Sequence, residues 1–515
     1  MLRAAVALAF FTGLPCAAAP GDWTMAAGDH ANTRFSALAQ VSPANVARLA
    51  PAFTFDTGVQ QGQEGAPIVA NGTMYLLSPY PNYLYALDLR NGDAKKWTFD
   101  PHAAPGAQGV ACCGVAARGI AYDNGRVFMV TLDGQAIAVD ADRGTELWRT
   151  RLADVARGET VTMAPLVVGG KLLVGNSGAA LGVRGWLAAL DTATGKQAWR
   201  AWSTGPDSDV LIGADFNPHY GQDRGRDLGV ATWPTDGWRT GGGSVSGWLS
   251  YDADAGLVYY GTDSPAPGNA EQRPGANKWT AGIFARDPAT GQARWFYQYS
   301  PHDLHGYDGS NENVLADLAI GGQSRKVLLH PDANGYLYVL DRLTGQVLSA
   351  DPFVRVTTSN GIAPATGALR YDAKHEPRVG EARRLICPSA AGAKNRQPSA
   401  WSPLTRLLYI PHQNLCQDSS TYDTAYIAGT PYGGVDSKMY AAPEQTRGAF
   451  TAWDPVARKA RWSVPERFPV WSGALATAGG VVFYGTMDGW FKAVDARDGK
   501  ALWRFRVDSG IVASR

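Results

Sequence analysis

Short apolar runs that end in Asp, a tight turn and usually a Trp recur along the chain. Seven copies are visible: YALDLRNGDAKKW (85–97), IAVDADRGTELW (137–148), LAALDTATGKQAW (187–199), FARDPATGQARW (284–295), YVLDRLTGQVLS (338–349, without the Trp), TAWDPVARKARW (451–462) and KAVDARDGKALW (492–503). Turn residues between two short apolar runs are typical of a β-hairpin. Each copy therefore predicts two adjacent antiparallel strands.

The spacing of these copies predicts the fold class. Their Asp recurs roughly every 41 to 54 residues, apart from two gaps of 96 and 113 that predict insertions or a worn repeat. A period near fifty residues with about four strands per unit indicates an all-β fold, a β-propeller. Seven copies and a further strand near Trp23 predict eight blades, and the repeated Trp is expected to pack between blades as a tryptophan-docking repeat.

The closure of the ring has two alternatives. The sequence stops twelve residues after Trp503. A propeller normally closes by pairing its first and last strands, since an open sheet edge is an aggregation hazard. Either Val507 to Ser514 completes the ring, or the propeller is incompletely closed at its C-terminus.

The composition fits a full-sized core and a nearly neutral surface. The chain has 515 residues, of which 45% are hydrophobic, and its 47 Lys and Arg almost balance its 46 Asp and Glu. This balance indicates neither nucleic acid nor an acidic membrane surface as a partner. A Gly count of 60 and a Trp count of 17 fit many turns and recurring aromatic anchors.

The first residues have the pattern of a secretory signal peptide. Arg3, an apolar run to Leu14 and small residues at 16–19 follow the expected order, and the run is too short to span a membrane. No later stretch is long and apolar enough to do so. We therefore assign residues 1–19 to a signal peptide and residues 20–515 to one propeller domain, and we expect the mature protein in the periplasm.

Four cysteines remain once Cys16 is removed with the signal peptide: Cys112, Cys113, Cys387 and Cys416. Four cysteines allow three pairings. We expect Cys112–Cys113 and Cys387–Cys416, because the second pair lies 29 residues apart and can close a loop. The alternative for the adjacent pair is two free or separately paired thiols. No Cys-x-x-Cys-His occurs, so a covalent c-type haem is not expected.

Many ordered blocks of the sequence resemble one enzyme family. They are QEGAPIV (63–69), ACCGVAARGIAY (111–122), TMAPLVV (162–168), SGAALGVRGWLAALD (177–191), STGPDSD (203–209), NPHYGQ (217–222), RPGANKWT (273–280), HPDANGYLYVLDR (330–342), ICPSA (386–390) and VWSGALATAGGVVFYGTMDG (470–489). From about residue 22 to its end, the chain resembles the large subunit of the pyrroloquinoline quinone (PQQ) dependent methanol and ethanol dehydrogenases. The resemblance implies oxidation of a small primary alcohol, a soluble cytochrome c as electron acceptor and an oligomer as one form of the protein.

The resemblance also implies a cofactor site. It places contacts to PQQ at Glu64, Cys112, Cys113, Arg118, Thr162, Ser177, Ser244, Asn395 and Trp471, with the adjacent cysteines as an apolar wall against one face of the quinone. Arg118 suits a multiply carboxylated ligand, because a guanidinium gives charge-assisted and often bidentate hydrogen bonds. A calcium or lanthanide ion is implied as well, with Ser264 and Asp308 at ligand positions.

Five positions depart from the pattern that the resemblance implies. Ala180 stands in place of a metal-binding Glu, Ser264 of a metal-binding Asn, Gly306 of the Asp base, Ala333 of the catalytic Arg and Ser246 of a Trp that stacks on the quinone. A positioned general base contributes about 10²–10⁴-fold to a rate. We therefore expect weak or no turnover. A rearranged site would depend on Asp308 or on Asp263.

Three functions remain open at this stage. The first is a working periplasmic quinoprotein dehydrogenase with an altered pocket. The second is a non-catalytic propeller that binds a ligand or a partner, or a decayed paralogue. The third is a scaffold for outer-membrane assembly, which is disfavoured by the poor lipidation context of Cys16 and by the Cys112–Cys113 pair.

Overall fold

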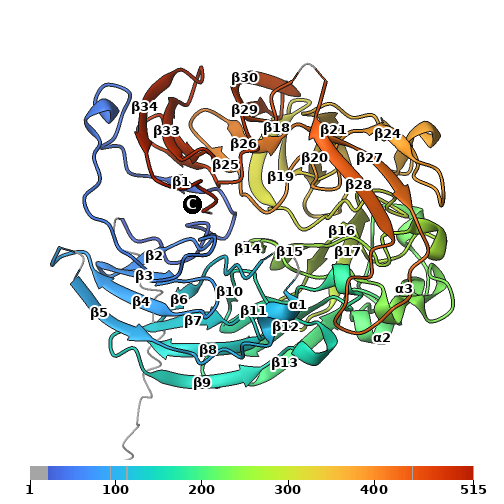
Figure 1. Ribbon diagram of the computed structural model, residues 1–515, viewed down its shortest axis with the longest axis horizontal. Helices are drawn as coiled ribbons and strands as arrows, with labels where there is room; N and C mark the ends of the chain where they lie inside the picture. The colour runs from blue at the N-terminus through green and yellow to red at the C-terminus, as the bar shows by residue number, and fades with distance from the viewer. Residues whose placement is uncertain (1–20, 93, 112–113, 444, 514–515) are drawn as a thin grey trace, which may run out of the picture.

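The computed structural model describes residues 21–92, 94–111, 114–443 and 445–513. Over these ranges, seven four-stranded antiparallel sheets are arranged as the blades of a ring (Figure 1). In chain order the blades are β2 (Ile68–Ala70), β3 (Thr73–Leu77), β4 (Leu84–Asp88) and β5 (Ala94–Phe99); β6 (Ala121–Asp123), β7 (Arg126–Val130), β8 (Gln135–Asp140) and β9 (Glu146–Arg151); β10 (Leu166–Val168), β11 (Lys171–Gly175), β12 (Trp186–Asp191) and β13 (Gln197–Trp202); β14 (Ser250–Asp252), β15 (Leu257–Thr262), β16 (Gly282–Arg286) and β17 (Ala293–Gln298); β18 (Val314–Ile320), β19 (Gln323–Pro331), β20 (Tyr336–Asp341) and β21 (Val347–Pro352); β25 (Ala400–Ser402), β26 (Leu407–Gln413), β29 (Gly448–Asp454) and β30 (Lys459–Glu466); and β31 (Leu475–Thr477), β32 (Val481–Gly485), β33 (Trp490–Asp495) and β34 (Ala501–Arg506).

The remaining elements lie outside these four-stranded repeats. A short strand, β1 (Phe35–Ser36), adds in parallel to β31 of the last blade. The other strands are β22 (Ser359–Ile362), β23 (Leu369–Tyr371), β24 (Arg383–Ile386), β27 (Leu415–Thr421) and β28 (Val435–Ala441). The helices are α1 (Ala107–Val110), α2 (Asp207–Val210), α3 (Leu228–Ala231) and the 3₁₀ helices Val46–Arg48, Val155–Arg157, Ala179–Leu181, Gly221–Asp223, Gly237–Thr240, Ala270–Gln272 and Ala373–His375.

The predicted β-propeller is confirmed, but the described residues hold seven blades rather than eight. The segment near Trp23 does not build a blade of its own. Trp23 forms an isolated bridge to Val69 and Met25 one to Ala121, so these residues extend the inner edges of the first two blades. After Met25 the chain turns and then pairs Phe35–Ser36 with β31 of the last blade, so the segment forms no hairpin of its own.

Both long gaps in the repeat hold insertions. The first contains α2, α3 and two 3₁₀ helices between β13 and β14 of neighbouring blades, and a further 3₁₀ helix, Ala270–Gln272, between β15 and β16. The second contains β22 to β24 and the long hairpin of β27 and β28, which leaves and re-enters the sixth blade between β26 and β29. Within this insertion, the predicted disulfide between Cys387 and Cys416 is formed. The expected Cys112–Cys113 bond and the signal peptide 1–19 lie outside the described residues.

Tryptophan docking holds successive blades together. The indole Nε1 of Trp97, Trp148, Trp199, Trp295 and Trp462 donates to the carbonyl oxygen of Ala141, Thr192, Pro288, Arg342 and Ala496, respectively, each at the turn that joins the last two strands of the next blade. The same turn contributes a glycine in the left-handed region, such as Gly195 with a φ of +70°. A Cβ on Gly195 would lie 2.6 Å from the ring of Trp148, so the indole requires glycine there.

The interface between the fifth and sixth blades lacks this tryptophan contact. In the fifth blade, Ser349 stands where the other copies have Trp, and in the facing turn Arg458 stands where they have Gly. Arg458 adopts a φ of +59° and pairs with Asp351 of β21, with 2.8 Å between Nη2 and Oδ1. An ion pair between partly exposed side chains therefore replaces the buried indole at this one interface.

Replacing Trp199 with Phe is expected to lower the free energy of unfolding by about 1–2 kcal/mol, because a hydrogen bond and part of a buried ring are lost. The side chain is 8% exposed and its Nε1 lies 3.0 Å from the oxygen of Pro288. Trp503→Phe is the matched control, since this ring packs on Phe491 and Phe505 of its own blade. We expect a loss of less than about 1 kcal/mol there. Equal losses in urea unfolding would contradict a docking role for Trp199.

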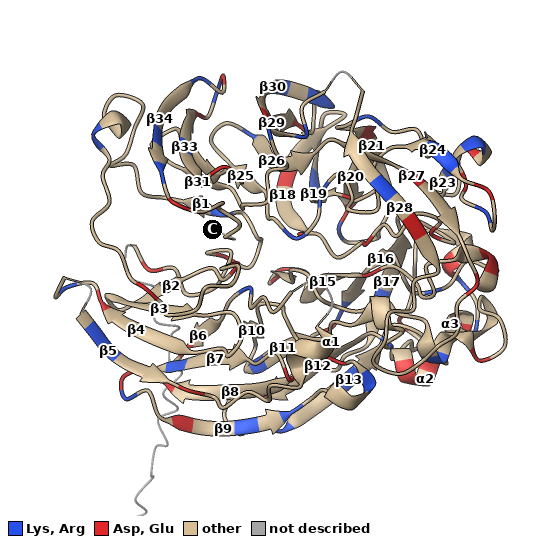
Figure 2. Cartoon of the chain, viewed as in Figure 1, with Lys and Arg blue, Asp and Glu red and all other residues tan. Residues whose placement is uncertain are grey.

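The first and last blades do not share a sheet or a hydrophobic cluster among the described residues, which fits an incompletely closed ring. Residues 37–67 connect them, and Val46 of this stretch packs against Val481, Phe483 and Ala493 of the last blade. Lys and Arg alternate with Asp and Glu over the blades, as Figure 2 shows, in keeping with a formal net charge of +1. Among the helices of the described residues, we find none with the length and apolarity needed to span a membrane.

Candidate functional site

Segments from five blades meet at one end of the inner strands. Arg118 precedes β6, Thr162 precedes β10 and Arg396 precedes β25, whereas Asp263 directly follows β15. The start of a blade's first strand and the end of its antiparallel second strand lie at the same end of the blade. These side chains therefore face a common cavity of about 150 Å³. Its lining also includes Gly114, Ser177, Gly178, Ala179, Ala180, Ser264, Gly306 and Asp308.

One wall of the cavity is a hydrogen-bonded row of polar side chains. Arg118 pairs with Glu64, with 3.0 Å between Nη2 and Oε2, and its Nη1 donates to Oγ1 of Thr162 at 2.7 Å. The Thr162 hydroxyl is in turn 2.9 Å from that of Ser177. Four side chains that the sequence predicts as quinone contacts are thus brought together. A cation flanked by hydroxyls can bind a carboxylated ligand.

The opposite wall is built around Arg396. Its Nη2 lies 2.7 Å from the hydroxyl of Ser246, 3.3 Å from Oδ1 of Asp263 and 3.5 Å from Oδ2 of Asp308. Ser246 donates to Oδ2 of Asp263 at 2.7 Å, and the backbone N–H of Ser264 donates to Oδ1 of Asp308 at 2.9 Å. Burial raises the pKa of Asp263 to about 6, an effect that the Asp308 charge increases and the Arg396 charge opposes.

Sequence reasoning missed Arg396. The residue follows Asn395 in a loop, and its partners lie 133 and 150 positions earlier in the chain. The available signal was the coincidence of a small residue, Ser246, with two carboxylates at positions 263 and 308. Such a set requires a cation, but the sequence does not say which of the arginines is near.

Gly306 and Ala333, two of the positions that depart from the family pattern, differ in the space available for a side chain. Gly306 lines the cavity with a φ of +78°, and a Cβ built on it would meet Ala390 at 3.9 Å, so the position has room for a side chain. Ala333 is 2% exposed and a Cβ on Gly392 would lie 2.9 Å from its own Cβ, which leaves little space there. Among the described residues, the Ser244 hydroxyl is buried without a hydrogen-bond partner, but Ser244 is not among the residues that line the cavity.

Asn395 and Trp471, two further predicted quinone contacts, are not among the residues that line the cavity. The amide of Asn395 is used within its own loop, where Nδ2 donates to the oxygen of Ala391 at 3.3 Å and Oδ1 accepts from Nη1 of Arg396 at 3.0 Å. Trp471 is half-buried and is not among the residues that line the cavity. Cys112 and Cys113 lie outside the described residues, although the next residue, Gly114, is part of the lining.

Comparison with known proteins agrees with this geometry. Residues 23–361 match the family model described as the glucose/ethanol/alcohol dehydrogenase beta-propeller domain that carries the name PQQ. The chain belongs to the PQQ-dependent alcohol dehydrogenase family.

Individual relatives of this PQQ-dependent alcohol dehydrogenase family cover most of the chain. The lanthanide-dependent methanol dehydrogenase of Methylacidiphilum fumariolicum is 48% identical over 500 residues, which are 96% of this chain and 82% of that protein. Subunit 1 of the cytochrome c methanol dehydrogenase of Methylorubrum extorquens is 40% identical over 508 residues, covering 95% of this chain and 81% of that one. A solved europium-containing methanol dehydrogenase superposes with a TM-score of 0.95 at 48% identity, over 96% of this chain and 87% of that chain.

A calcium or lanthanide ion, as the family implies, does not fit the residues of this chain. Such ions take six or more oxygen ligands at full coordination. Position 180 offers a methyl group, and among the described residues no group of three or more His, Cys, Asp or Glu is placed to hold a metal. The two carboxylates that do face the cavity, Asp263 and Asp308, are already paired with Arg396.

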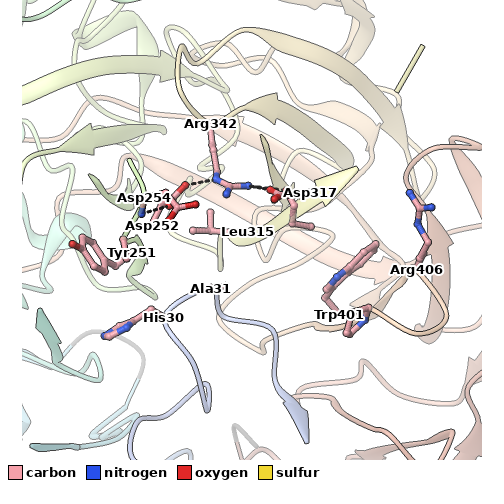
Figure 3. Close-up of a pocket in the computed structure, with 13 residues that line it drawn as sticks. His30, Ala31, Tyr251, Asp252, Asp254, Leu315, Asp317, Arg342, Trp401 and Arg406 are labelled. Atoms are coloured by element: carbon pink, nitrogen blue, oxygen red, sulfur yellow. Dashed lines mark hydrogen bonds and ion pairs between the residues drawn. The ribbon is translucent and has the colours of Figure 1, made fainter. Parts of the chain in front are cut away.

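A larger pocket of about 530 Å³ lies at the other end of β14 and β15 (Figure 3). Its charged groups neutralise one another: Nε of Arg342 is 2.6 Å from Oδ2 of Asp252, and Nη1 is 2.7 Å from Oδ1 of Asp317. Because Arg342 joins β20 to residues of β14 and β18, this network holds inner strands of adjacent blades together. We assign it a structural role.

Proposed function

We propose that this chain binds PQQ in its central cavity and oxidises alcohols weakly or not at all. The observation that carries the proposal is a contrast within the cavity: the predicted quinone contacts are present, whereas the base is missing. The wall of Glu64, Arg118, Thr162 and Ser177 keeps the polar groups that a carboxylated quinone would contact. At the position of the base, by contrast, the chain has Gly306.

The groups that remain near Gly306 are poorly suited to replace the base. A base must be free to accept a proton from the alcohol. Asp308 accepts the backbone N–H of Ser264 and pairs with Arg396, and Asp263 accepts the hydroxyl of Ser246 and pairs with the same guanidinium. Each of these contacts occupies a carboxylate oxygen, so neither side chain can accept the proton of an alcohol there without giving up a partner.

Each residue of the quinone wall has a distinct part in this proposal. Arg118 would bind a carboxylate of the ligand while Glu64 fixes its guanidinium, and Thr162 and Ser177 would offer hydroxyls. When bound, the quinone supplies a two-electron acceptor. The cavity of about 150 Å³ is smaller than the ~300 Å³ typical of ligand sites, so binding requires side chains at its mouth to move outward.

We further propose a cellular location, a substrate class and an electron acceptor for this chain. An exported location in the periplasm is supported by the predicted signal peptide. A small primary alcohol as substrate and a cytochrome c as electron acceptor would apply to whatever turnover remains. A non-catalytic propeller that binds a quinone or a partner is the alternative, and the pairing of Asp263 and Asp308 with Arg396 favours it.

Titration of the purified protein with PQQ, followed by quenching of tryptophan fluorescence, tests the binding half of the proposal. We expect saturable binding, and we expect Arg118→Ala to weaken it about 10- to 100-fold, because charge-assisted hydrogen bonds are lost. Arg143→Ala, at an exposed turn of the second blade, is the matched control and should bind like the wild type. Absence of saturable binding by the wild type would refute quinone binding.

Dye-linked oxidation of methanol and ethanol, with PQQ and calcium or lanthanum added, tests the catalytic half. Weak or undetectable turnover is expected. Rapid turnover by the unaltered chain would show that another group acts as the base.

A further inference from the structure

The guanidinium of Arg396 lies between two acidic side chains at the centre of the propeller. Its Nη2 is 3.3 Å from Asp263 and 3.5 Å from Asp308, and these carboxylates come from different blades. The side chains are only 21%, 5% and 22% exposed, respectively, so the charges interact with limited screening by water. A cation is thus already present where the two carboxylates meet.

We infer that Arg396 is the resident cation of this cavity, and that the chain binds its carboxylated ligand between Arg118 and Arg396 without a metal ion. The inference that no metal ion is needed rests only on the geometry of the wall built around Arg396. The part about the ligand deepens the proposed function and rests on it.

All four carboxylate oxygens of this wall already have partners. Oδ1 of Asp263 faces Nη2 of Arg396, and Oδ2 accepts the hydroxyl of Ser246 at 2.7 Å. For Asp308, Oδ1 accepts the N–H of Ser264 at 2.9 Å and Oδ2 faces the same guanidinium. A metal ion would have to displace these donors and would then lie next to a positive charge.

The position of Arg396 is fixed from several sides. Its carbonyl oxygen accepts the indole N–H of Trp248 at 2.8 Å, and its Nη1 donates to Oδ1 of Asn395 at 3.0 Å. Ser246 makes room for the guanidinium, since its hydroxyl lies 2.7 Å from Nη2 and 3.2 Å from Nε. A large side chain at position 246 would fill the space that the guanidinium occupies. The small residue and the arginine therefore form a matched pair.

Trp-sensitised terbium luminescence tests the inference without any quinone. We expect no saturable terbium signal from the wild type. Arg396→Gln removes the charge but keeps a polar side chain. We expect its terbium dissociation constant to be at least about ten-fold lower than any that the wild type shows, because two carboxylates lose their cation. Arg396→Lys keeps the charge and should behave like the wild type. Adding Asp308→Asn to Arg396→Gln should abolish the gain.

The outcomes separate the inference from the proposed function. Saturable terbium binding by the wild type that Asp308→Asn abolishes would overturn the inference, and so would an Arg396→Gln protein with a native circular dichroism spectrum and no gain. The second readout is the PQQ dissociation constant of the wild type with and without EDTA, which should change by less than about two-fold. A much weaker constant in EDTA would overturn binding without a metal. A failure of PQQ to bind at all would refute the proposed function and the placement of the ligand, but not the assignment of the resident cation.

Discussion

Restoring a carboxylate at position 306 is expected to raise quinone-dependent alcohol oxidation by about 10²–10⁴-fold, the usual contribution of a positioned base, but only if the Arg396 charge is removed as well. The variant combines Gly306→Asp with Ala180→Glu and Arg396→Gln, and it leaves Ala333 unchanged because that buried position has little space for a longer side chain. With Arg396 retained, the new carboxylate would meet a cation in the cavity that lowers its basicity. The measurement is dye-linked turnover of methanol in the presence of PQQ and lanthanum.

The structure makes this substitution at position 306 feasible. A Cβ built on Gly306 meets no atom closer than the 3.9 Å of Ala390, so the side chain has space. Its φ of +78° lies in the left-handed region, which costs an ordinary residue about 1–2 kcal/mol and Asp less. Gly321→Asp, at a turn with a φ of +59° and open surroundings, carries the same change without facing the cavity and should leave turnover unchanged. A triple variant that binds both PQQ and lanthanum and still fails to exceed the wild type would contradict the prediction.

Lys394→Met is expected to destabilise the fold by about 3–5 kcal/mol, because it leaves a buried carboxylate without its partner. Nζ of Lys394 lies 2.8 Å from Oε2 of Glu312, and both side chains are fully buried. The other oxygen of Glu312 accepts the backbone N–H of Ser399 at 2.8 Å. Urea unfolding at neutral pH measures the loss.

A second ion pair of the same length provides the control. Nζ of Lys326 also lies 2.8 Å from a carboxylate oxygen, that of Asp254, but the two side chains are 35% and 80% exposed. Water screens this pair, so Lys326→Met should cost far less stability than Lys394→Met. Similar losses in the two variants would show that burial does not set the strength of the Lys394 pair. Since Lys394 lies two residues before Arg396, its loss should also disturb the Arg396 wall.

The fold could be predicted from the sequence because its unit is local. One hairpin with Asp, Gly and Trp at fixed spacing defines the last two strands of a blade, and the indole then reaches the same turn of the next copy, as Trp148 does with Gly195. The predicted count of eight blades differs from the seven of the described residues because Trp23 adds an isolated bridge to an existing sheet. A single bridging residue has no periodicity from which a blade can be recognised.

The candidate site was predictable only where a residue type is tied to its position in a sequence block. Arg118, Thr162 and Ser177 follow from such blocks and do face one cavity. Asn395 follows from the same reasoning, but its amide is taken up within its own loop. Arg396 could not be assigned, since its partners Ser246 and Asp263 lie 150 and 133 positions earlier and only the arrangement of the blades brings them together.

The interface at which Arg458 replaces the glycine of the docking turn has a consequence for how the ring responds to its surroundings. Contacts made by buried indoles are indifferent to ionic strength, whereas an ion pair whose arginine is 56% exposed weakens as salt shortens the Debye length to about 8 Å at physiological concentration. The contact between the fifth and sixth blades is therefore expected to weaken as the salt concentration rises. The long hairpin of the sixth blade and the loop that carries Arg396 both lie on the C-terminal side of that interface, together with the sixth and seventh blades.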